Sequence, residues 1–325
     1  MNVPILIEAV DLVKNFDVSN AWGRKSKVVI QAVSKVNIKI YEGETFALVG
    51  ESGCGKSTIG RLLLNLIRPT SGCVLFEGKD INKLNSKEIL DIRKKMQIIF
   101  QDPYASLNPR MNVYNIISEP LITHKVFKTH EETVKRVEEL MSKVGIRKEF
   151  IYSYPHQFSG GQRQRIGIAR ALALNPKLIV CDEPVSALDV SIQSQILNLL
   201  HDLQDEFKLT YLFISHDLSV VRYISTRVCV MFLGKICEVG DTDELFKNPL
   251  HPYTKFLINA VPKPDPKLRG EDKEILTGEM PSPLNPPSGC RFHTRCPYVS
   301  NICEKEEPKM KNYYGRMVAC HNVLR

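Results

Sequence analysis

The stretch that decides the fold reads Gly50-Glu51-Ser52-Gly53-Cys54-Gly55-Lys56-Ser57-Thr58. It fits the pattern G-x-x-x-x-G-K-[ST] at every fixed position, follows an apolar run at Thr45–Val49, and precedes an apolar helical run at Ile59–Ile67. Glycines let backbone N–H groups curl around an anion, and the N-terminus of a following helix adds the positive end of its dipole. A strand, a glycine-rich turn and a helix in this order predict a phosphate-binding loop.

Two side chains of this loop have distinct expected roles. The ammonium of Lys56 can reach the β- and γ-phosphates of a nucleotide, and the hydroxyl of Ser57 can ligate Mg²⁺. At Cys54 we expect the backbone N–H to matter more than the sulfur. The residues of the loop expected to contact the nucleotide are Ser52, Gly53, Cys54, Gly55, Lys56, Ser57 and Thr58.

A second, acidic element supports a nucleotide site. The run Leu178–Glu183 is an apolar strand that ends in two carboxylates. Asp182 suits an outer-shell magnesium role, and Glu183 is placed to accept a proton from an attacking water. Without the glycine-rich loop, a salt-bridged strand end would be the simpler interpretation.

The remaining pattern indicates an α/β fold. Short runs that are apolar on both faces are typical of strands covered by helices on both sides, and an amphipathic helix is expected at about Ser191–Phe207. Strands that alternate with helices predict a mainly parallel sheet. The predicted strands are Thr45–Val49, Gln97–Phe100, Leu178–Cys181 and Tyr211–Ser215.

Composition excludes several other classes of protein. Of the 325 residues, 43% are apolar and 25% charged, which is ordinary globular usage and excludes a disordered or collagen-like chain. The longest apolar run, Val228–Leu233, is far shorter than the roughly 20 residues that span a bilayer. The N-terminus carries no export pattern, so a cytoplasmic location is expected. The net charge of +8 is dispersed, which favours a solvated surface and no nucleic-acid partner.

Proline and cysteine concentrate near the C-terminus. Ten of the 19 prolines lie in residues 251–325, and four of the nine cysteines lie in residues 290–325. Proline-rich stretches cannot continue a helix or lie inside a sheet. We therefore predict a compact domain at 1–247 and a small Pro/Cys-rich extension at 248–325.

A further motif names the family. The sequence Ser159-Gly160-Gly161-Gln162-Arg163-Gln164-Arg165 begins a helical stretch that ends near Leu174. Together with the loop and the acidic strand, it makes the chain resemble the ATP-binding subunits of ABC transporters over about residues 5–245. The resemblance implies a P-loop ABC-type ATPase domain with a helical subdomain at about 102–175.

The resemblance also implies roles for single residues. Gln101 is similar to the Q-loop glutamine, which ligates Mg²⁺ and senses the membrane subunit. Asp189 resembles the D-loop aspartate, and His216 resembles the switch histidine that contacts the γ-phosphate. Phe16 is the aromatic expected to stack on adenine, although Trp22 lies nearby in an insertion at about 19–27.

Each motif occurs once, which predicts a dimer. In this family the signature of one subunit closes over the phosphate loop of the other. The contacts expected from the signature come from a hydroxyl, backbone N–H groups and a helix N-terminus, and lie at Ser159, Gly160, Gly161 and Gln162. The chain therefore needs a second ATPase subunit, identical or paralogous, in a head-to-tail dimer.

The C-terminal region indicates which subfamily of ABC ATPases the chain resembles. His251-Pro252-Tyr253-Thr254 and the segment from Gly278 to Pro297 are similar to dipeptide and oligopeptide importer ATPases. This implies an ATP-hydrolysing motor at the cytoplasmic face of the membrane. Its implied partners are two transmembrane permease subunits and an external peptide-binding protein. Nickel chelates or other small solutes are the alternative cargo.

The four C-terminal cysteines are spaced C-x5-C-x6-C-x16-C, at Cys290, Cys296, Cys303 and Cys320. Disulfides are not expected in a reducing cytoplasm, and spacing alone leaves zinc and iron–sulfur chemistry open. The resemblance implies a four-iron four-sulfur cluster, with zinc and free thiols as alternatives.

Two other functional classes compete with the transport motor. Soluble ABC ATPases that act on DNA or the ribosome carry two cassettes or a long coiled-coil insertion, and this chain shows neither. A regulatory module in which ATP binding gates a partner would not need Glu183 and His216, so hydrolysis is favoured.

Overall fold

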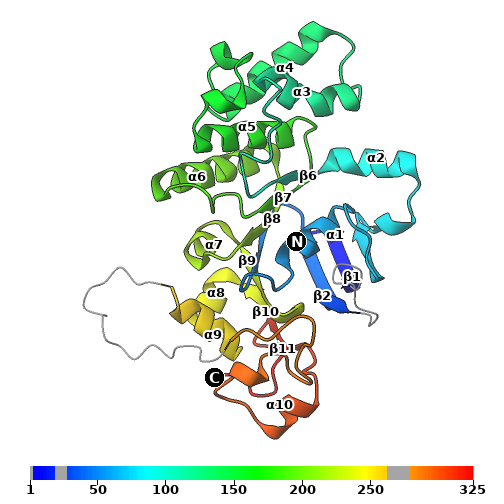
Figure 1. The fold of residues 1–325 in the computed structure, drawn as a ribbon, viewed down its shortest axis with the longest axis vertical. Coiled ribbons are helices and arrows are strands. Elements are labelled where there is room, and N and C mark those ends of the chain that lie inside the picture. Colours follow the sequence, from blue (N-terminus) through cyan, green and yellow to red (C-terminus); the bar gives the residue numbers. More distant parts are fainter. Residues whose placement is uncertain (1–2, 19–27, 262–278, 325) are drawn as a thin grey trace. The chain divides into compact units, whose positions relative to one another are not determined.

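The computed structural model describes residues 3–18, 28–261 and 279–324 (Figure 1). The chain divides into two compact units. The first unit contains the phosphate-binding loop and the C-terminal region, and the second contains most of the central part of the chain. The first unit comprises Met1–Tyr41, Thr45–Asn82 and Ser215–Arg325, and the second comprises Glu42–Glu44 and Lys83–Ile214.

The second unit is built on three parallel strands. β6 (Met96–Ile99) pairs with β7 (Leu178–Asp182), which pairs with β8 (Thr210–Ser215). Every residue of β7 and β8 is buried, because helices cover a parallel sheet on both faces. The acidic strand predicted from the sequence is therefore a central strand of this unit.

The helices α2 and α5 contact β6, and α3, α4 and α5 pack on one another as a helical layer (Figure 1). Side chains define several of their N-termini. Asn85 and Thr129 each accept an N–H bond from the first turn that follows, as helix-capping residues do. The helices of the second unit are α2 (Ser86–Lys95), α3 (Val113–Thr123), α4 (His130–Lys143), α5 (Gly160–Leu172) and α6 (Val190–Phe207).

The first unit contains an antiparallel sheet that the apolar-run analysis did not predict. Its strand order is β2-β1-β4-β5. β1 and β2 are half-buried strands of 13 residues, and several register shifts interrupt their pairing. The strands are β1 (Ile5–Asp17), β2 (Val29–Tyr41), β4 (Ser71–Phe76) and β5 (Lys79–Asp80).

A second set of strands in this unit runs in the order β11-β12-β10-β9-β3. Only β3 and β9 pair in parallel, and the other pairs are antiparallel. The strands are β3 (Thr45–Val49), β9 (Arg227–Phe232), β10 (Lys235–Asp241), β11 (Lys311–Tyr313) and β12 (Arg316–Val318). The helices are α1 (Lys56–Leu63), α7 (Leu218–Ile224), α8 (Thr242–Lys247), α9 (Pro252–Asn259) and α10 (Asn301–Lys305).

The region after residue 247 shares a core with the strands before it. The rings of Tyr253 and Phe292 lie 4.8 Å and 5.3 Å, respectively, from the ring of Phe232 on β9, measured between centroids. All three side chains are at most 1% exposed. Burial of such aromatic surface is a large stabilising contribution, so the C-terminal region is docked on the first unit. The domain boundary at 247 stays a prediction.

The predicted α/β architecture with parallel strands is confirmed, but antiparallel pairs outnumber parallel ones because of the β2-β1-β4-β5 sheet and the β9–β12 strands. The predicted strands match β3, β6, β7 and β8 to within one residue. The helix expected at Ile59–Ile67 instead begins at Lys56 and ends at Leu63. It ends early because Asn65 has a φ of 52°, a left-handed conformation that a helix cannot continue. In the part of the chain that the structure describes, no helix combines the length and apolarity needed to cross a bilayer.

Candidate functional site

The phosphate-binding loop connects β3 to α1 and packs directly on neighbouring backbone. Gly50 and Gly55 have φ values of 150° and 107°. A Cβ at Gly50 would lie 2.1 Å from the Met231 carbonyl oxygen, and a Cβ at Gly55 would lie 2.2 Å from the Ala32 carbonyl oxygen. These distances are too short for any side chain. Glycine is therefore required so that the loop can curl against β2 and β9.

Lys56 is the first residue of α1 and is only 5% exposed. Its Nζ donates to the carbonyl oxygens of Gly50 at 2.8 Å and Glu51 at 3.1 Å. Gly55 at the N-cap has no side chain, so the cap residue does not cover the first-turn N–H groups. A helix N-terminus beside a held ammonium is a site that favours a phosphate.

The other predicted loop contacts surround this centre. Ser52 and Gly53 are exposed, and Ser57 and Thr58 are half-buried in the first turn of α1. Cys54 is 1% exposed, and burial raises the pKa of its thiol, which keeps it protonated. The backbone N–H of Cys54 donates to the Glu51 carbonyl at 3.3 Å. This hydrogen bond must break before the same N–H can donate to a phosphate.

The predicted adenine-stacking residue lies in the same unit as the loop. Phe16 is on β1 and is 37% exposed, and the Lys14 ammonium lies 5.1 Å from the centroid of its ring. His216 also belongs to this unit, directly before Asp217, which caps α7. Trp22 and its insertion lie outside the described residues. The stacking and switch roles stay predictions.

Three predicted residues gather at the carboxyl ends of β6 and β7 in the second unit. Asp182 ends β7 and is 8% exposed. Glu183 follows with a φ of 49°, an uncommon backbone conformation for a non-glycine residue. The side-chain amide of Gln101 donates to Oε2 of Glu183 at 2.9 Å. The structure thus brings the predicted Q-loop glutamine and the predicted catalytic carboxylate into contact.

The signature residues form the N-terminus of α5. The Ser159 hydroxyl accepts the Gln162 N–H at 3.3 Å, and the Gln162 side chain accepts the Ser159 N–H at 3.0 Å. This reciprocal capping box orders the turn. A Cβ on Gly161 would lie 2.5 Å from Cγ2 of Ile192 on α6, so this glycine also serves helix packing, which the sequence did not indicate. The signature thus presents Gly160 at an ordered helix N-terminus.

Asp189 begins α6. Its carboxylate accepts the Ile192 N–H at 3.0 Å and the Ser191 hydroxyl at 2.7 Å. These bonds, the one from Ser191 foremost, lower the pKa of Asp189. Val190 beside it is 79% exposed. The predicted D-loop aspartate is therefore an N-cap next to an exposed apolar side chain.

The four C-terminal cysteines converge although the sequence separates them by up to 30 positions. One small cavity is lined by Cys290, Cys296, Cys303 and Cys320. His251, His293 and His321 also line it. Burial raises the pKa of the Cys290 thiol to about 11 and that of Cys320 to about 12.

Hydrogen bonds surround the sulfur atoms. The Asn322 N–H donates to Sγ of Cys320 at 3.3 Å. The backbone at Phe292 and Tyr298 partly offsets the effect of burial on the pKa values of Cys290 and Cys296. The Ser300 hydroxyl lies 3.3 Å from Sγ of Cys303. Such bonds stabilise thiolates at metal sites. Among the described residues, however, no group of three or more His, Cys, Asp or Glu side chains has the geometry of a metal site.

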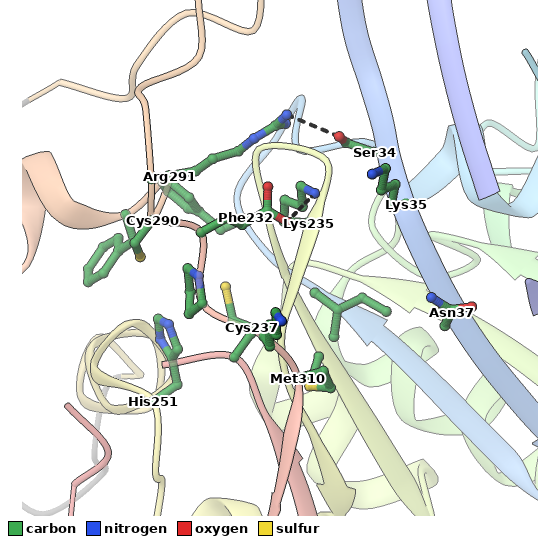
Figure 2. Close-up of a pocket in the computed structure, with 17 residues that line it drawn as sticks. Ser34, Lys35, Asn37, Phe232, Lys235, Cys237, His251, Cys290, Arg291 and Met310 are labelled. Atoms are coloured by element: carbon green, nitrogen blue, oxygen red, sulfur yellow. Dashed lines mark hydrogen bonds and ion pairs between the residues drawn. The ribbon is translucent and has the colours of Figure 1, made fainter. Parts of the chain in front are cut away.

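A larger cavity of about 560 Å³ adjoins the cysteines and shares Cys290 and His251 with their cavity (Figure 2). It lies between β2 and the C-terminal region. Arg291 crosses its edge and donates to the side chains of Gln31 at 2.8 Å and Ser34 at 3.2 Å. Arg291 therefore ties the cysteine-bearing segment to β2.

Two residues in contact with the loop were missed in the sequence analysis. The Tyr253 hydroxyl and the Arg295 guanidinium both bond to Glu51, the second residue of the phosphate-binding loop. Tyr253 belongs to the His251–Thr254 motif and Arg295 immediately precedes Cys296, so the signals were present. The sequence did not indicate that these two residues contact Glu51, because more than 200 residues separate them from the loop.

Comparison with known proteins identifies two families along the chain. Residues 33–186 match the family described as ABC transporter, and residues 237–303 match the family described as oligopeptide/dipeptide transporter, C-terminal region. The putative oligopeptide transport ATP-binding protein YkfD of Bacillus subtilis is 52% identical over 97% of this chain and 95% of its own length. The oligopeptide transport ATP-binding protein OppF of Salmonella typhimurium is 50% identical over 98% of this chain and 96% of its own.

A solved structure agrees with this relationship. The ATP-binding cassette MJ0796, in a dimeric post-hydrolysis state bound to ADP and Pi, has a TM-score of 0.64 and 31% identity to this chain. The match covers 73% of this chain and 98% of that one. The resemblance predicted from the motifs is confirmed: the chain belongs to the oligopeptide transport ATP-binding proteins of the ABC transporter family.

Proposed function

We propose that this chain is the ATP-hydrolysing motor subunit of an importer that takes up dipeptides and oligopeptides. The observation that carries the proposal is about 50% identity, over nearly the whole chain, to proteins named for oligopeptide or dipeptide transport. The likeness includes the C-terminal region and is therefore more specific than an ATPase domain alone.

The loop and α1 bind the phosphates in this proposal. Lys56 exchanges its bonds to the Gly50 and Glu51 carbonyls for the β- and γ-phosphate oxygens, and the first-turn N–H groups of α1 donate to the same anion. Phe16 stacks on the adenine ring. A buried ammonium is costly without an anionic partner, so a bound nucleotide satisfies Lys56 better than two neutral carbonyls do.

Glu183 acts as the general base. The Gln101 amide donates to Oε2 of this carboxylate and orients it, and the carboxylate accepts a proton from the attacking water. His216 contacts the γ-phosphate. Ser57, Gln101 and Asp182 would hold Mg²⁺, which would neutralise phosphate charge when bound.

The site is completed by a second subunit. The capped N-terminus of α5, with Ser159, Gly160 and Gly161, contacts the γ-phosphate held by the partner's loop, and Asp189 lies at the same interface. The solved cassette to which this fold is similar is dimeric, which supports a second subunit, and we propose that the two subunits pair head to tail. We further propose two transmembrane permease subunits, an external peptide-binding protein, and a peripheral position at the cytoplasmic face of the membrane.

The cysteine cavity is proposed to hold a four-iron four-sulfur cluster, with zinc as the alternative. The chemistry of the donor set supports either group, because four thiols line one cavity and the Asn322 N–H donates to Sγ of Cys320, although the thiols do not have the geometry of a metal site as they stand. The space between the side chains is only about 10 Å³, so loading requires the thiols to rotate outward. A bound cluster would cross-link the C-terminal region.

Metal analysis tests the cysteine proposal. Protein purified without oxygen should be brown and contain iron and acid-labile sulfide, and Cys303→Ser should lose both. Cys73→Ser is the matched control, since this cysteine lies on β4, outside the cavity. A colourless wild-type protein with stoichiometric zinc would overturn the cluster in favour of zinc.

Transport coupling tests the proposed function. The chain is purified with its membrane subunits and partner ATPase, and ATP hydrolysis is measured with the peptide-loaded binding protein. Peptides should stimulate turnover, and Lys56→Ala should abolish it. Stimulation by a nickel chelate or another small solute, with no response to any peptide, would reject the peptide cargo and retain the motor.

A further inference from the structure

The second residue of the phosphate-binding loop is held from the C-terminal region. The Glu51 N–H donates to the Tyr253 hydroxyl at 3.0 Å. Nη1 of Arg295 lies 3.1 Å from Oε1 and 2.9 Å from Oε2 of the Glu51 carboxylate. Both the backbone and the side chain of Glu51 are therefore fixed by residues that follow position 247 in the chain.

These contacts lie largely out of solvent. The side chain of Arg295 is 9% exposed and that of Glu51 is 26% exposed. Tyr253 is fully buried, and its ring centroid lies 5.2 Å from that of Phe292. Water screens such an ion pair less than a surface pair, and a buried guanidinium is costly without its carboxylate. The contact is thus specific rather than a loose surface association.

Arg295 is itself positioned by the cysteine segment. It ends a short 3-10 turn, His293–Arg295, directly before Cys296. Its N–H donates to the Phe292 carbonyl at 3.0 Å, and the Cys296 N–H donates to the His293 carbonyl at 3.3 Å. Because these backbone bonds hold Arg295 and Cys296 in one turn, a backbone displacement at Cys296 also displaces the residue that holds Glu51.

The held residue is adjacent to the phosphate-binding lysine. The Glu51 carbonyl accepts a bond from Nζ of Lys56 at 3.1 Å. Displacing Glu51 therefore shifts both the carbonyl that orients Lys56 and the peptide that begins the loop. This contact connects the cysteine cavity to the ammonium expected to bind the γ-phosphate.

We propose that Arg295 and Tyr253 are positioning residues of the nucleotide site, and that the state of the cysteine site sets nucleotide affinity through them. The proposal rests on the proposed function, in that the loop binds ATP. Coupling of this kind is reciprocal: a ligand that orders the cysteines strengthens nucleotide binding, and nucleotide strengthens retention of that ligand by the same factor.

The primary test measures the Kd of the full-length chain for a non-hydrolysed ATP analogue with Mg²⁺. Arg295→Gln should weaken binding roughly tenfold, because a charge-assisted bond to the loop is lost, and Tyr253→Phe about fivefold. Arg295→Lys should recover part of the affinity. Lys309→Gln, an exposed change of the same charge in the C-terminal region, should leave Kd unchanged.

A double variant separates positioning from general damage. Glu51→Gln with Arg295→Gln should bind no more weakly than Arg295→Gln alone, because both changes break one contact. Hydrogen exchange at residues 50–56 should accelerate in Arg295→Gln, while exchange in β6 and β7 stays the same. With the partner subunits present, the KM for ATP should rise and kcat should change little.

The link between the cysteine cavity and nucleotide affinity is tested with Cys296→Ser, and Cys73→Ser is the control. Cys296→Ser should weaken nucleotide binding about as much as Arg295→Gln, and combining the two should add nothing further. Equal Kd values for Arg295→Gln and Lys309→Gln would refute the positioning role. An unchanged Kd in Cys296→Ser would refute the link to the cysteines. If the wild-type chain itself bound no nucleotide, that result would refute the proposed function, on which the positioning role depends.

Discussion

Replacing Arg316 by methionine should destabilise the first unit strongly, because it leaves a buried carboxylate without its cation. Glu238 on β10 is 0% exposed, and Nη1 of Arg316 on β12 lies 3.3 Å from its Oε1. The same carboxylate accepts the N–H groups of Leu250 at 3.2 Å and His251 at 2.9 Å. This cluster joins the C-terminal hairpin to the start of α9.

The magnitude follows from burial. Removing one partner of a buried ion pair costs about 3–5 kcal/mol, because the remaining charge stays desolvated. Lys39→Met is the matched control. Lys39 pairs with Glu8 at 3.2 Å on the same unit but is 53% exposed, so its loss should cost at most about 1 kcal/mol.

The loss of stability in Arg316→Met should also depend on pH. Burial already raises the pKa of Glu238, and loss of Arg316 raises it further. The native state of the variant then binds the proton more tightly than its unfolded state, so its stability falls as pH rises between the unfolded and folded pKa values. The deficit relative to wild type should be largest at pH 7.5 and smaller at pH 5.

Urea denaturation followed by circular dichroism measures these free energies, and hydrogen exchange in β12 assigns the loss to the first unit. The reasoning would be refuted if Arg316→Met cost no more than Lys39→Met. A loss of stability of equal size at pH 7.5 and pH 5 would show that the ionised carboxylate of Glu238 is not the cause of the destabilisation.

Three further changes have definite expected outcomes. Glu183→Gln should bind ATP yet slow hydrolysis by roughly 10²–10⁴ and accumulate the closed dimer in size-exclusion chromatography; normal turnover would reject its role as base. Gly50→Ala should abolish nucleotide binding in calorimetry, because its Cβ would lie 2.1 Å from the Met231 carbonyl oxygen; retained affinity would show that the loop can relax. Gly161→Ala should lower the melting temperature through contact with Cγ2 of Ile192 at 2.5 Å, and Ile192→Ala in the same chain should restore part of it.

The sequence alone determined what depends on neighbours along the chain. The phosphate-binding loop needs a strand, glycines at set positions and a helix start, all within Thr45–Leu63. The strand at Leu178–Asp182 and the helix beginning at Gly160 are likewise specified by local apolar runs and a capping box. These elements were therefore predicted to within a few residues.

Contacts between residues that are distant in the chain became evident only from the three-dimensional packing. The irregular β1–β2 pairing has register shifts that a period-2 pattern does not reveal, so the antiparallel sheet was missed. The contact of Arg295 with Glu51 and the convergence of four cysteines join positions far apart in the chain. Such contacts depend on packing around Phe232 and Phe292, whereas periodicity and capping report only hydrogen bonds and burial within one element.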